Sequence, residues 1–269
     1  MITKYPLTLG HKNTGMINVI ELNLNGLCNL TCSFCPRSQD YPNTNQHMSE
    51  DTLDLICDQI KEIPYTVDIH LSGRGEPTLH KSFDVVISKL KALTNCTLQL
   101  TTNGAKWSKW LDSIKQVDLI VYNVYSDNEE DFWLATERLE NVSCKHELNL
   151  KSLDGSKRFI KTSDGSINYA PWYLTNRTGH VINENVNNAP TGHGYCFRPF
   201  EKIFINLNGD FVFCCEDWSD QPLSNIYTES IYNYYQHNSK LKEIRAELQK
   251  GRRIGACADC SYPGHRLGV

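Results

Sequence analysis

The chain has 269 residues, of which 40% are apolar, enough for one large domain or for one domain with a small appendage. Its net charge of −4 excludes the basic surface that binds nucleic acid or anionic membranes, and no signal peptide or membrane-length apolar run is present. We therefore expect a cytoplasmic protein with no nucleic-acid or membrane partner, whose eleven cysteines are metal ligands or catalytic groups rather than disulfides.

Strands and helices are predicted to alternate along residues 17–151. The predicted strands cover residues 17–26, 66–73, 97–104, 118–126 and 144–151, and the predicted helices cover residues 50–62, 82–93, 108–117 and 128–140. Ser49 is expected to cap the first helix. Strands separated by amphipathic helices form right-handed crossovers. We therefore expect a mostly parallel sheet with functional groups at the carboxyl ends of its strands.

The alternation ends near residue 160. Residues 161–200 are rich in Asn, Gly, Thr and Pro, and we expect them to be irregular. The stretch KIFINLNGDFVFC, residues 202–214, predicts a β-hairpin around Asn208-Gly209. A long helix is expected over about residues 229–250. This pattern favours a small second domain.

Three cysteines follow the first predicted strand in the stretch LCNLTCSFCPRS. Cys28, Cys32 and Cys35 have the spacing C-x₃-C-x₂-C. A metal site that saturates its metal usually supplies four protein ligands, so three leave one position for a small molecule. The alternative is a zinc-binding loop in a non-enzymatic protein, with His47 or water in the open position.

With Phe34 before the third cysteine, this stretch resembles the signature of the radical S-adenosylmethionine (SAM) enzymes. The resemblance implies an α/β fold, a partial (β/α)6 TIM-like barrel, with a four-iron, four-sulfur (4Fe-4S) cluster on the three cysteines. It also implies that S-adenosylmethionine binds the fourth iron and is cleaved to a 5′-deoxyadenosyl radical, which abstracts hydrogen from a substrate. A flavodoxin- or ferredoxin-type protein would donate the electron.

Three further stretches lie at predicted strand ends. SGRGEP (72–77) resembles the family's Gly-Gly-Glu-Pro motif, with Arg74 at the first Gly position, which implies that Gly75 and Glu76 contact the methionyl amine. TTNG (101–104) and YSDN (125–128) stand where the family places cofactor contacts. The residues that the resemblance implies there are Thr102, Asn103 and Ser126.

A second group of cysteines lies in the C-terminal part, at Cys196, Cys214, Cys257 and Cys260. Its spacing resembles the twitch domain, a shortened SPASM domain, and implies a second 4Fe-4S cluster, although four thiolates also suit a structural zinc ribbon. The implied division is a radical SAM core (1–160), a connector that completes the barrel and the substrate pocket (161–195), and an auxiliary-cluster domain of a hairpin and a helix (196–269).

Among twitch enzymes, the chain resembles the aminocyclitol dehydrogenase of butirosin biosynthesis in its cysteine spacing and in TNRTG (175–179). This likeness implies that Arg177 faces the substrate, and a structural hydrogen-bond donor is the alternative. We expect oxidation of a sugar, an aminocyclitol or a related metabolite, with the auxiliary cluster accepting the second electron. His193, Glu216 and Asp217 are candidate bases that the sequence does not rank.

Cys215 decides between two reactions. It is either a buried thiol beside the second cluster or a hydrogen-atom donor, and the second role would make the enzyme an epimerase. Maturation of a peptide is a further alternative. About twenty residues precede the first predicted strand, which is too few for the leader-recognition domain of many peptide-modifying relatives, so we favour a small substrate.

Iron content tests the two cysteine groups. Two 4Fe-4S clusters require about eight iron ions per chain with matching acid-labile sulfide, and Cys214→Ala should lower this to about four. Cys28→Ala should abolish cofactor cleavage. Cys57→Ala, which changes a cysteine on the apolar face of helix 50–62, is the control and should keep the full iron content. Full iron in Cys214→Ala, or one or two zinc ions in the wild type, would contradict the prediction.

Overall fold

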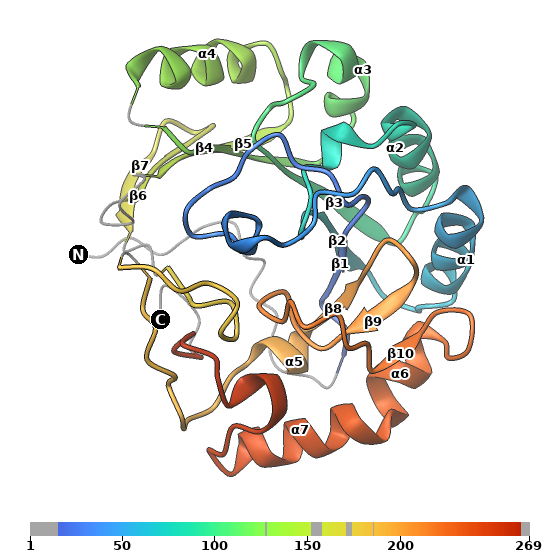
Figure 1. The fold of residues 1–269 in the computed structure, drawn as a ribbon. Coiled ribbons are helices and arrows are strands. Elements are labelled where there is room, and N and C mark those ends of the chain that lie inside the picture. Colours follow the sequence, from blue (N-terminus) through green and yellow to red (C-terminus); the bar gives the residue numbers. More distant parts are fainter. Residues whose placement is uncertain (1–15, 127, 152–157, 171–173, 185, 265–269) are drawn as a thin grey trace.

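A computed structural model of the chain describes residues 16–126, 128–151, 158–170, 174–184 and 186–264. Its described strands form a ten-stranded sheet in the order β10-β9-β8-β1-β2-β3-β4-β5-β6-β7 (Figure 1). The strands are β1 (Val19–Leu22), β2 (Val67–Leu71), β3 (Cys96–Thr102), β4 (Leu119–Val124), β5 (Lys145–Lys151), β6 (Arg158–Thr162), β7 (Ile167–Ala170), β8 (Lys202–Ile205), β9 (Asp210–Val212) and β10 (Ser224–Asn225). The α-helices are α1 (Glu50–Lys61), α2 (Phe83–Lys91), α3 (Leu111–Ile114), α4 (Glu129–Glu140), α5 (Arg198–Glu201), α6 (Ile231–His237) and α7 (Ser239–Gln249).

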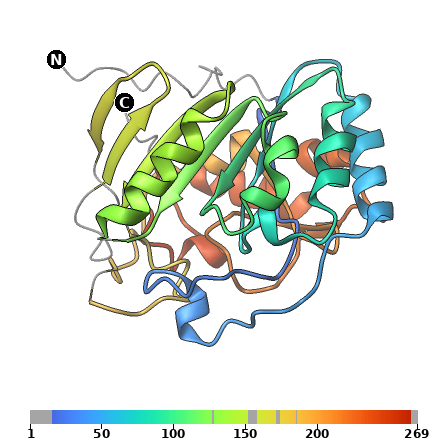
Figure 2. The same cartoon turned by 90° about the horizontal axis from the view of Figure 1, so that it is seen from above.

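Six parallel strands form the curved centre of the sheet. Strands β1 to β5 run parallel in chain order, and β8 joins them by pairing in parallel with β1. Helices α1 to α4 cover the outer side of this part, whereas α6 and α7 lie beside β8 and β9 (Figures 1 and 2). This arrangement confirms the predicted α/β fold with a partial barrel. Within the described ranges, no helix is long and apolar enough to cross a membrane.

Helix α1 shows why the local sequence folds as predicted. The Ser49 Oγ accepts a hydrogen bond from the Thr52 amide at 3.1 Å, which satisfies a donor of the first helical turn. Leu53, Ile56 and Ile60 recur at helical spacing and are all buried against the sheet. The cap and the apolar period together place the helix within one residue of its predicted bounds.

Polar residues line the inner face of the barrel. In β2 the side chains of Val67, Ile69 and Leu71 are buried on one face, so His70 points to the other, inner face. In β3 the same alternation directs Gln99 inward. Parallel sheets between helices are usually apolar on both faces. The polar inner face therefore indicates a binding site rather than a packed core.

The segment 161–200, expected to be irregular, contains regular structure at both ends. Strands β6 and β7 form an antiparallel hairpin that continues the sheet beyond β5, and α5 begins at Arg198. In the hairpin turn, the Asp164 Oδ1 accepts hydrogen bonds from Thr162 Oγ1 at 2.6 Å and from the Ser166 amide at 2.8 Å. Gly165 then takes a φ of 82°, so this Asp-Gly pair is a true turn signal within a segment of irregular composition.

The prediction of a single long helix over residues 229–250 is wrong, because the structure has two helices there. Helices α6 and α7 are separated at Asn238, whose φ of −56° and ψ of 124° are not helical. The Asn238 Oδ1 accepts a hydrogen bond from the Leu241 amide at 3.0 Å and thereby caps α7. Apolar periodicity continues across the break, so it does not reveal a cap in the middle of the pattern.

The predicted hairpin around Asn208-Gly209 is confirmed as β8 and β9. Gly209 takes a φ of 81°, and a Cβ there would lie 2.4 Å from the Ile226 side chain, so the turn requires glycine. Because β8 also pairs with β1, the sheet runs through the boundary expected at residue 196. The division into three parts stays a prediction.

A buried aromatic pair joins the hairpin to the C-terminal helices. The rings of Phe211 on β9 and Tyr234 on α6 stack with centroids 4.2 Å apart and planes at 5°. Both residues are almost fully buried. Such pairs contribute packing beyond the area that they bury.

Removing this pair should destabilise the protein. Phe211→Ala is expected to lower the free energy of unfolding by about 3–5 kcal/mol, because it deletes a buried ring and leaves a cavity. Urea unfolding of the anaerobically prepared protein measures the change. Tyr232→Ala removes an exposed ring from the same helix α6 and should change stability by less than about 0.5 kcal/mol. Equal effects of the two substitutions would contradict the assignment.

Candidate active site

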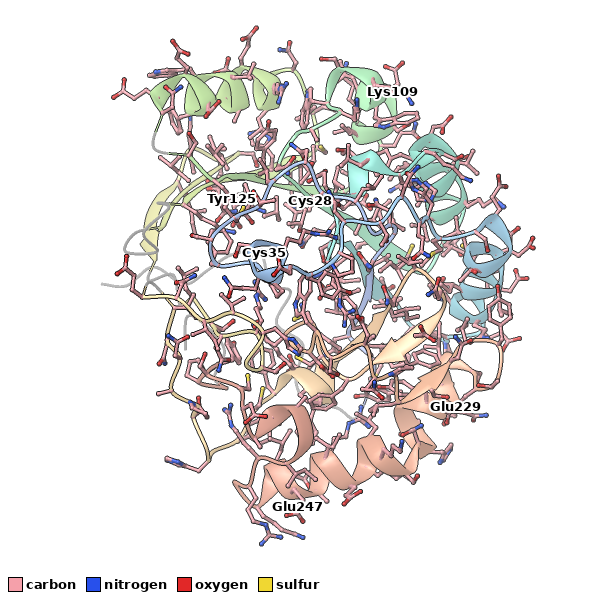
Figure 3. All side chains as sticks on the ribbon, in the orientation of Figure 1. Cys28, Cys35, Lys109, Tyr125, Glu229 and Glu247 are labelled. Carbon is pink, nitrogen blue, oxygen red and sulfur yellow. The ribbon has the colours of Figure 1, made fainter. Side chains whose placement is uncertain are left out.

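A cavity of about 500 Å³ lies at the carboxyl ends of the parallel strands. Its wall comes from the cysteine loop after β1, from the inner strand face, and from segments that follow β7 and β9. Figure 3 shows Cys28, Cys35 and Tyr125 near the middle of the molecule, where the cysteine loop crosses the barrel mouth. The predicted site residues that line the cavity are Cys28, Cys32, Phe34, Cys35, Gly75, Glu76, Thr102, Asn103, Arg177 and Cys215.

One buried arginine holds the cysteine loop in place. The Arg37 guanidinium donates to the carbonyl oxygen of Arg74 at 2.8 and 3.0 Å, to that of Gly26 at 2.8 Å and to that of Pro42 at 3.0 Å. The loop that carries the cysteines is thereby fixed to the SGRGEP segment after β2. The sequence offers no signal for this role beyond the position of Arg37 two residues after Cys35.

The three cysteine side chains of the loop need a nearby positive charge in order to lose their protons. Burial, together with Cys35 and Cys28, raises the pKa of Cys32 to about 12, and burial also raises the pKa of Cys28. Three neighbouring thiolates are therefore stable only when metal cations compensate them. A single zinc would hold its thiolates within about 4 Å of one another. Among the described residues, no group of three or more His, Cys, Asp or Glu side chains is arranged to hold a metal ion.

Glu76 is a buried carboxylate held by three neighbouring residues. Its Oε1 accepts hydrogen bonds from Thr78 Oγ1 at 2.7 Å, from the Thr78 amide at 3.1 Å and from Thr102 Oγ1 at 2.5 Å. Its Oε2 accepts one from the Asn103 amide at 2.8 Å. Burial raises the pKa of Glu76, and these hydrogen bonds oppose that rise. The carboxylate is thus oriented towards the cavity with Oε2 available to a cationic ligand.

The motif around Glu76 tolerates arginine in place of the first glycine. The buried side chain of Arg74 donates to Tyr41 Oη at 2.8 Å and to the Asp217 carbonyl oxygen at 2.7 Å. It also forms an ion pair with Asp220. Gly75 is not replaceable in the same way. A Cβ there would lie 2.3 Å from the Asn25 carbonyl oxygen and 2.8 Å from that of Leu27.

The remaining predicted cofactor contacts divide into two groups. Thr102 and Asn103 orient Glu76, and Phe34 packs 5.3 Å from Tyr125 in a small apolar cluster beside the cysteine loop. Ser126 is not among the residues that line the cavity. Its Oγ accepts a hydrogen bond from the Asn128 amide at 3.1 Å, so it stabilises the turn before α4. The roles of all four stay predictions.

The cysteines of the second group are not among the residues that line the cavity. Cys196, Cys257 and Cys260 are buried, and Cys214 is half-buried. Burial, followed by the proximity of Cys196 and Cys260, raises the pKa of Cys257 to about 12. These thiols therefore meet the same electrostatic requirement for metal cations as the first group, and their assignment as ligands stays a prediction.

Cys215 lines the cavity, whereas the neighbouring Cys214 is absent from its lining. Strand β9 ends at Val212, so a turn rather than strand alternation separates the two side chains. A hydrogen bond with Cys214, followed by burial, raises the pKa of Cys215 well above its usual value. Cys215 therefore carries a thiol hydrogen at neutral pH.

Arg177 projects into the cavity from a left-handed stretch of backbone. Arg177, Thr178 and Gly179 have φ values of 48°, 54° and 88°. The Arg177 Nη1 lies 3.1 Å from Glu216 Oε1, and Arg198 Nη1 lies 2.5 Å from the same oxygen. Burial raises the pKa of Glu216, but the two arginines outweigh it and bring the pKa to about 2. Arg177 is thus placed for substrate contact, and its ion pair with Glu216 also stabilises the cavity wall.

The three candidate bases differ in their position relative to the cavity and in their partners. Glu216 lines the cavity but is neutralised by two guanidinium groups. Asp217 is buried and accepts a hydrogen bond from the Ser219 amide at 3.0 Å, and His193 is exposed; neither is among the cavity residues. His47, suggested as a zinc ligand, bonds Asn45 at 3.0 Å and stacks edge-on to His80, away from the cysteines.

The sequence motifs did not predict a group of polar residues at the cavity floor. Glu21 (β1), His70 (β2), Gln99 (β3) and Lys202 (β8) all line the cavity. The signal that could have predicted them is the presence of polar residues at alternate positions in strands such as VDIHL and CTLQLTT. Alternation of this kind, in strands flanked by helices, indicates a barrel interior that is polar and accessible to solvent.

Comparison with known families and proteins shows the family of the chain. Residues 22–168 match the radical SAM superfamily, and residues 196–261 match the SPASM iron–sulfur cluster-binding domain. The chain is 22% identical over 253 residues to the S-adenosyl-L-methionine-dependent 2-deoxy-scyllo-inosamine dehydrogenase of Niallia circulans, covering 91% of this chain and 93% of that protein. It is 23% identical over 232 residues to the GTP 3′,8-cyclase of a Synechocystis species, covering 81% and 68%.

Solved structures show the same fold. The structure of BtrN in complex with AdoMet and 2-DOIA superposes with a TM-score of 0.70 at 19% identity, covering 91% of this chain and 93% of that one. Native anSMEcpe with bound AdoMet gives a TM-score of 0.56 at 13% identity, covering 85% and 82%. At these identities the likeness establishes the architecture alone.

The hydrogen bonds on Glu76 predict the effect of Thr102→Val. The substitution removes the hydroxyl that donates to Oε1, so the pKa of Glu76 should rise further and its anion should bind the methionyl amine less well. We expect S-adenosylmethionine to bind about tenfold more weakly, in line with the loss of one hydrogen bond to a charged group. Calorimetric titration of unreduced, cluster-loaded protein measures the affinity. Thr102→Ser retains the hydroxyl and should bind within about twofold of the wild type; equal weakening in both variants would contradict the role of the hydroxyl.

Proposed function

The chain belongs to the radical SAM superfamily, and on that premise we propose that it oxidises a hydroxyl-bearing carbon of a small polar substrate. Enzymes of this superfamily use S-adenosylmethionine and a 4Fe-4S cluster, and the SPASM domain binds a further iron–sulfur cluster. When bound, these groups supply a radical that abstracts hydrogen and an acceptor for the second electron. The chain's own residues bind and orient the substrate and handle its proton.

The residues that would hold these groups are distributed around the cavity. Glu76, fixed by Thr102 and Asn103, would bind the methionyl amine through a charge-assisted hydrogen bond. The proposed ligands of the first cluster are Cys28, Cys32 and Cys35, and those of the auxiliary cluster are Cys196, Cys214, Cys257 and Cys260.

One observation carries the proposal: a single cavity is bordered by the cysteine loop on one side and by the segment next to Cys214 on the other. Cys28, Cys32 and Cys35 contribute to the first border, and Cys215 and Glu216 contribute to the second. A substrate in this space would lie between the source of the radical and the proposed electron acceptor. That order suits a two-electron oxidation.

The lining favours a small polyhydroxylated substrate. Its inner face presents carboxylate, amide, ammonium and imidazole groups, and about 500 Å³ is in the range of small-molecule sites. The similar dehydrogenase of Niallia circulans carries 2-deoxy-scyllo-inosamine in its name, and this supports a cyclitol or a sugar as substrate class. A flavodoxin- or ferredoxin-type protein is the proposed electron donor.

Cys215 favours a second candidate function. Its thiol lines the cavity and keeps its hydrogen at neutral pH. A carbon radical formed in the cavity would take that hydrogen atom from sulfur and so invert a stereocentre without net oxidation. The thiyl radical left on Cys215 would return to the thiol with one electron from the proposed electron donor and one proton from solvent. Arg177 would orient the substrate in both reactions.

Product analysis of the wild type and Cys215→Ala distinguishes the two functions. We expect the wild type, reduced in D₂O with candidate cyclitols, sugars and peptides, to give a product that has lost two hydrogen atoms. Cys215→Ala should form the same product at a rate within about threefold, because it removes no proposed ligand or base. Mass spectrometry of the product and of 5′-deoxyadenosine measures both.

The opposite outcome is equally specific. Deuterium at an unoxidised, inverted carbon in the wild type, lost in Cys215→Ala, would replace the dehydrogenase proposal with the epimerase. Cys144→Ala, which changes a cysteine at the start of β5 outside the cavity lining, is the matched control and should behave as the wild type.

A further inference from the structure

The floor of the cavity holds a histidine whose ring faces open space. His70 lies on the inner face of β2, in register with Glu21 of β1, and both side chains line the cavity. No hydrogen bond to the His70 ring is present among the described residues, although the side chain lines the cavity. The ring therefore offers a nitrogen lone pair to a bound molecule.

Burial and the charge of Lys202 keep the His70 ring neutral. Glu21 faces it from β1 and Lys202 approaches from β8, while β3 contributes the uncharged Gln99. Burial, followed by the charge of Lys202, holds the pKa of His70 well below its usual 6.5. The imidazole is consequently in its proton-accepting form at neutral pH.

The acidic residues of the cavity are committed to other partners. Glu21 accepts a hydrogen bond from Ser72 Oγ at 2.6 Å, and its second oxygen lies 3.8 Å from Lys202 Nζ. Glu216 is paired with Arg177 and Arg198. Glu76 is occupied by Thr78, Thr102 and Asn103 at the cysteine-loop end. These carboxylates are therefore already engaged by other side chains and backbone amides of the cavity wall.

We propose that His70 is the general base that accepts the hydroxyl proton of the substrate, an assignment that rests on the oxidation proposed above. After hydrogen abstraction at carbon, the O–H bond breaks and the proton forms an N–H bond on the imidazole. The remaining electron would pass to the auxiliary iron–sulfur cluster that Cys196, Cys214, Cys257 and Cys260 would hold, which would be reduced by one electron as the carbon becomes a carbonyl. Glu21, the register neighbour of His70 on β1, carries a charge that would favour the imidazolium that results.

His70→Gln tests the base separately from binding. Glutamine retains a hydrogen-bonding side chain but accepts no proton. We expect carbonyl formation to fall by about a hundredfold or more. Transfer of deuterium from a C–D substrate into 5′-deoxyadenosine should persist, because abstraction precedes proton loss. Calorimetry on unreduced protein should give a substrate Kd within about threefold of the wild type, since binding needs no turnover.

The pH profile adds a second signature. In the wild type, carbonyl formation should decline as pH falls through the lowered pKa of His70, because the protonated ring accepts no proton. His70→Gln should lose this acidic limb, and His237→Gln, a histidine on helix α6 outside the cavity lining, should keep it. If His70→Gln fails to fold, His70→Ala with added imidazole replaces it, and rescue in proportion to neutral imidazole is expected.

The outcomes separate the two proposals. Wild-type turnover and an unchanged acidic limb in His70→Gln would overturn the base while leaving the oxidation intact. A Kd raised a hundredfold or more, with turnover preserved at saturation, would make His70 a binding residue and would likewise overturn the assignment. If the wild type oxidises no cyclitol or sugar, the proposed function fails, and the base fails with it.

Discussion

The pairing of β8 with β1 is the contact on which the rest of the structure depends. Parallel strands need a long crossover between them, and here the crossover is the whole series from β2 to β7. Pairing at four positions brings the first parallel strand beside the last and closes this side of the barrel. The cysteine loop that follows β1 and the Cys215–Glu216 turn that follows β9 consequently border one cavity. Sequence segments almost two hundred residues apart thus share a site.

Buried charged groups hold the cavity wall by different means. Arg37 ties together three stretches of backbone through carbonyl oxygens, so its charge is compensated by dipoles rather than by an acid. Glu76 and Glu216 are anions fixed by hydrogen bonds or guanidinium groups. His70, by contrast, is a titratable cavity side chain with no described hydrogen-bond partner. The division separates groups that build the site from a group that is free to react in it.

Local signals in the sequence predicted much of the fold and of the cofactor end of the site. The spacing of Cys28, Cys32 and Cys35, the Ser49 cap and the Asn208-Gly209 turn act over a few residues, and each one is visible without knowledge of the tertiary structure. The break at Asn238 was missed because a polar residue in a helical pattern usually faces solvent.

The substrate end of the site was less accessible from the sequence. Glu21, His70 and Lys202 come from three strands, and only the sheet register shows that they meet. Ser126 accepts a hydrogen bond from the Asn128 amide, a turn contact that the sequence alone does not reveal, and its role as a cofactor contact stays a prediction. Arg37 was missed for a similar reason, since its partners are carbonyl groups and leave no pattern in the sequence.

The burial of the cysteine thiols has a consequence for how the protein matures. Burial raises the pKa values of Cys28, Cys32, Cys196, Cys257 and Cys260, so these side chains are protonated in the metal-free chain at neutral pH. Loading of iron and sulfide must therefore expel several protons. Assembly of the holoprotein is in this sense an acid–base reaction, and its equilibrium shifts towards the loaded form as the surrounding medium becomes more alkaline.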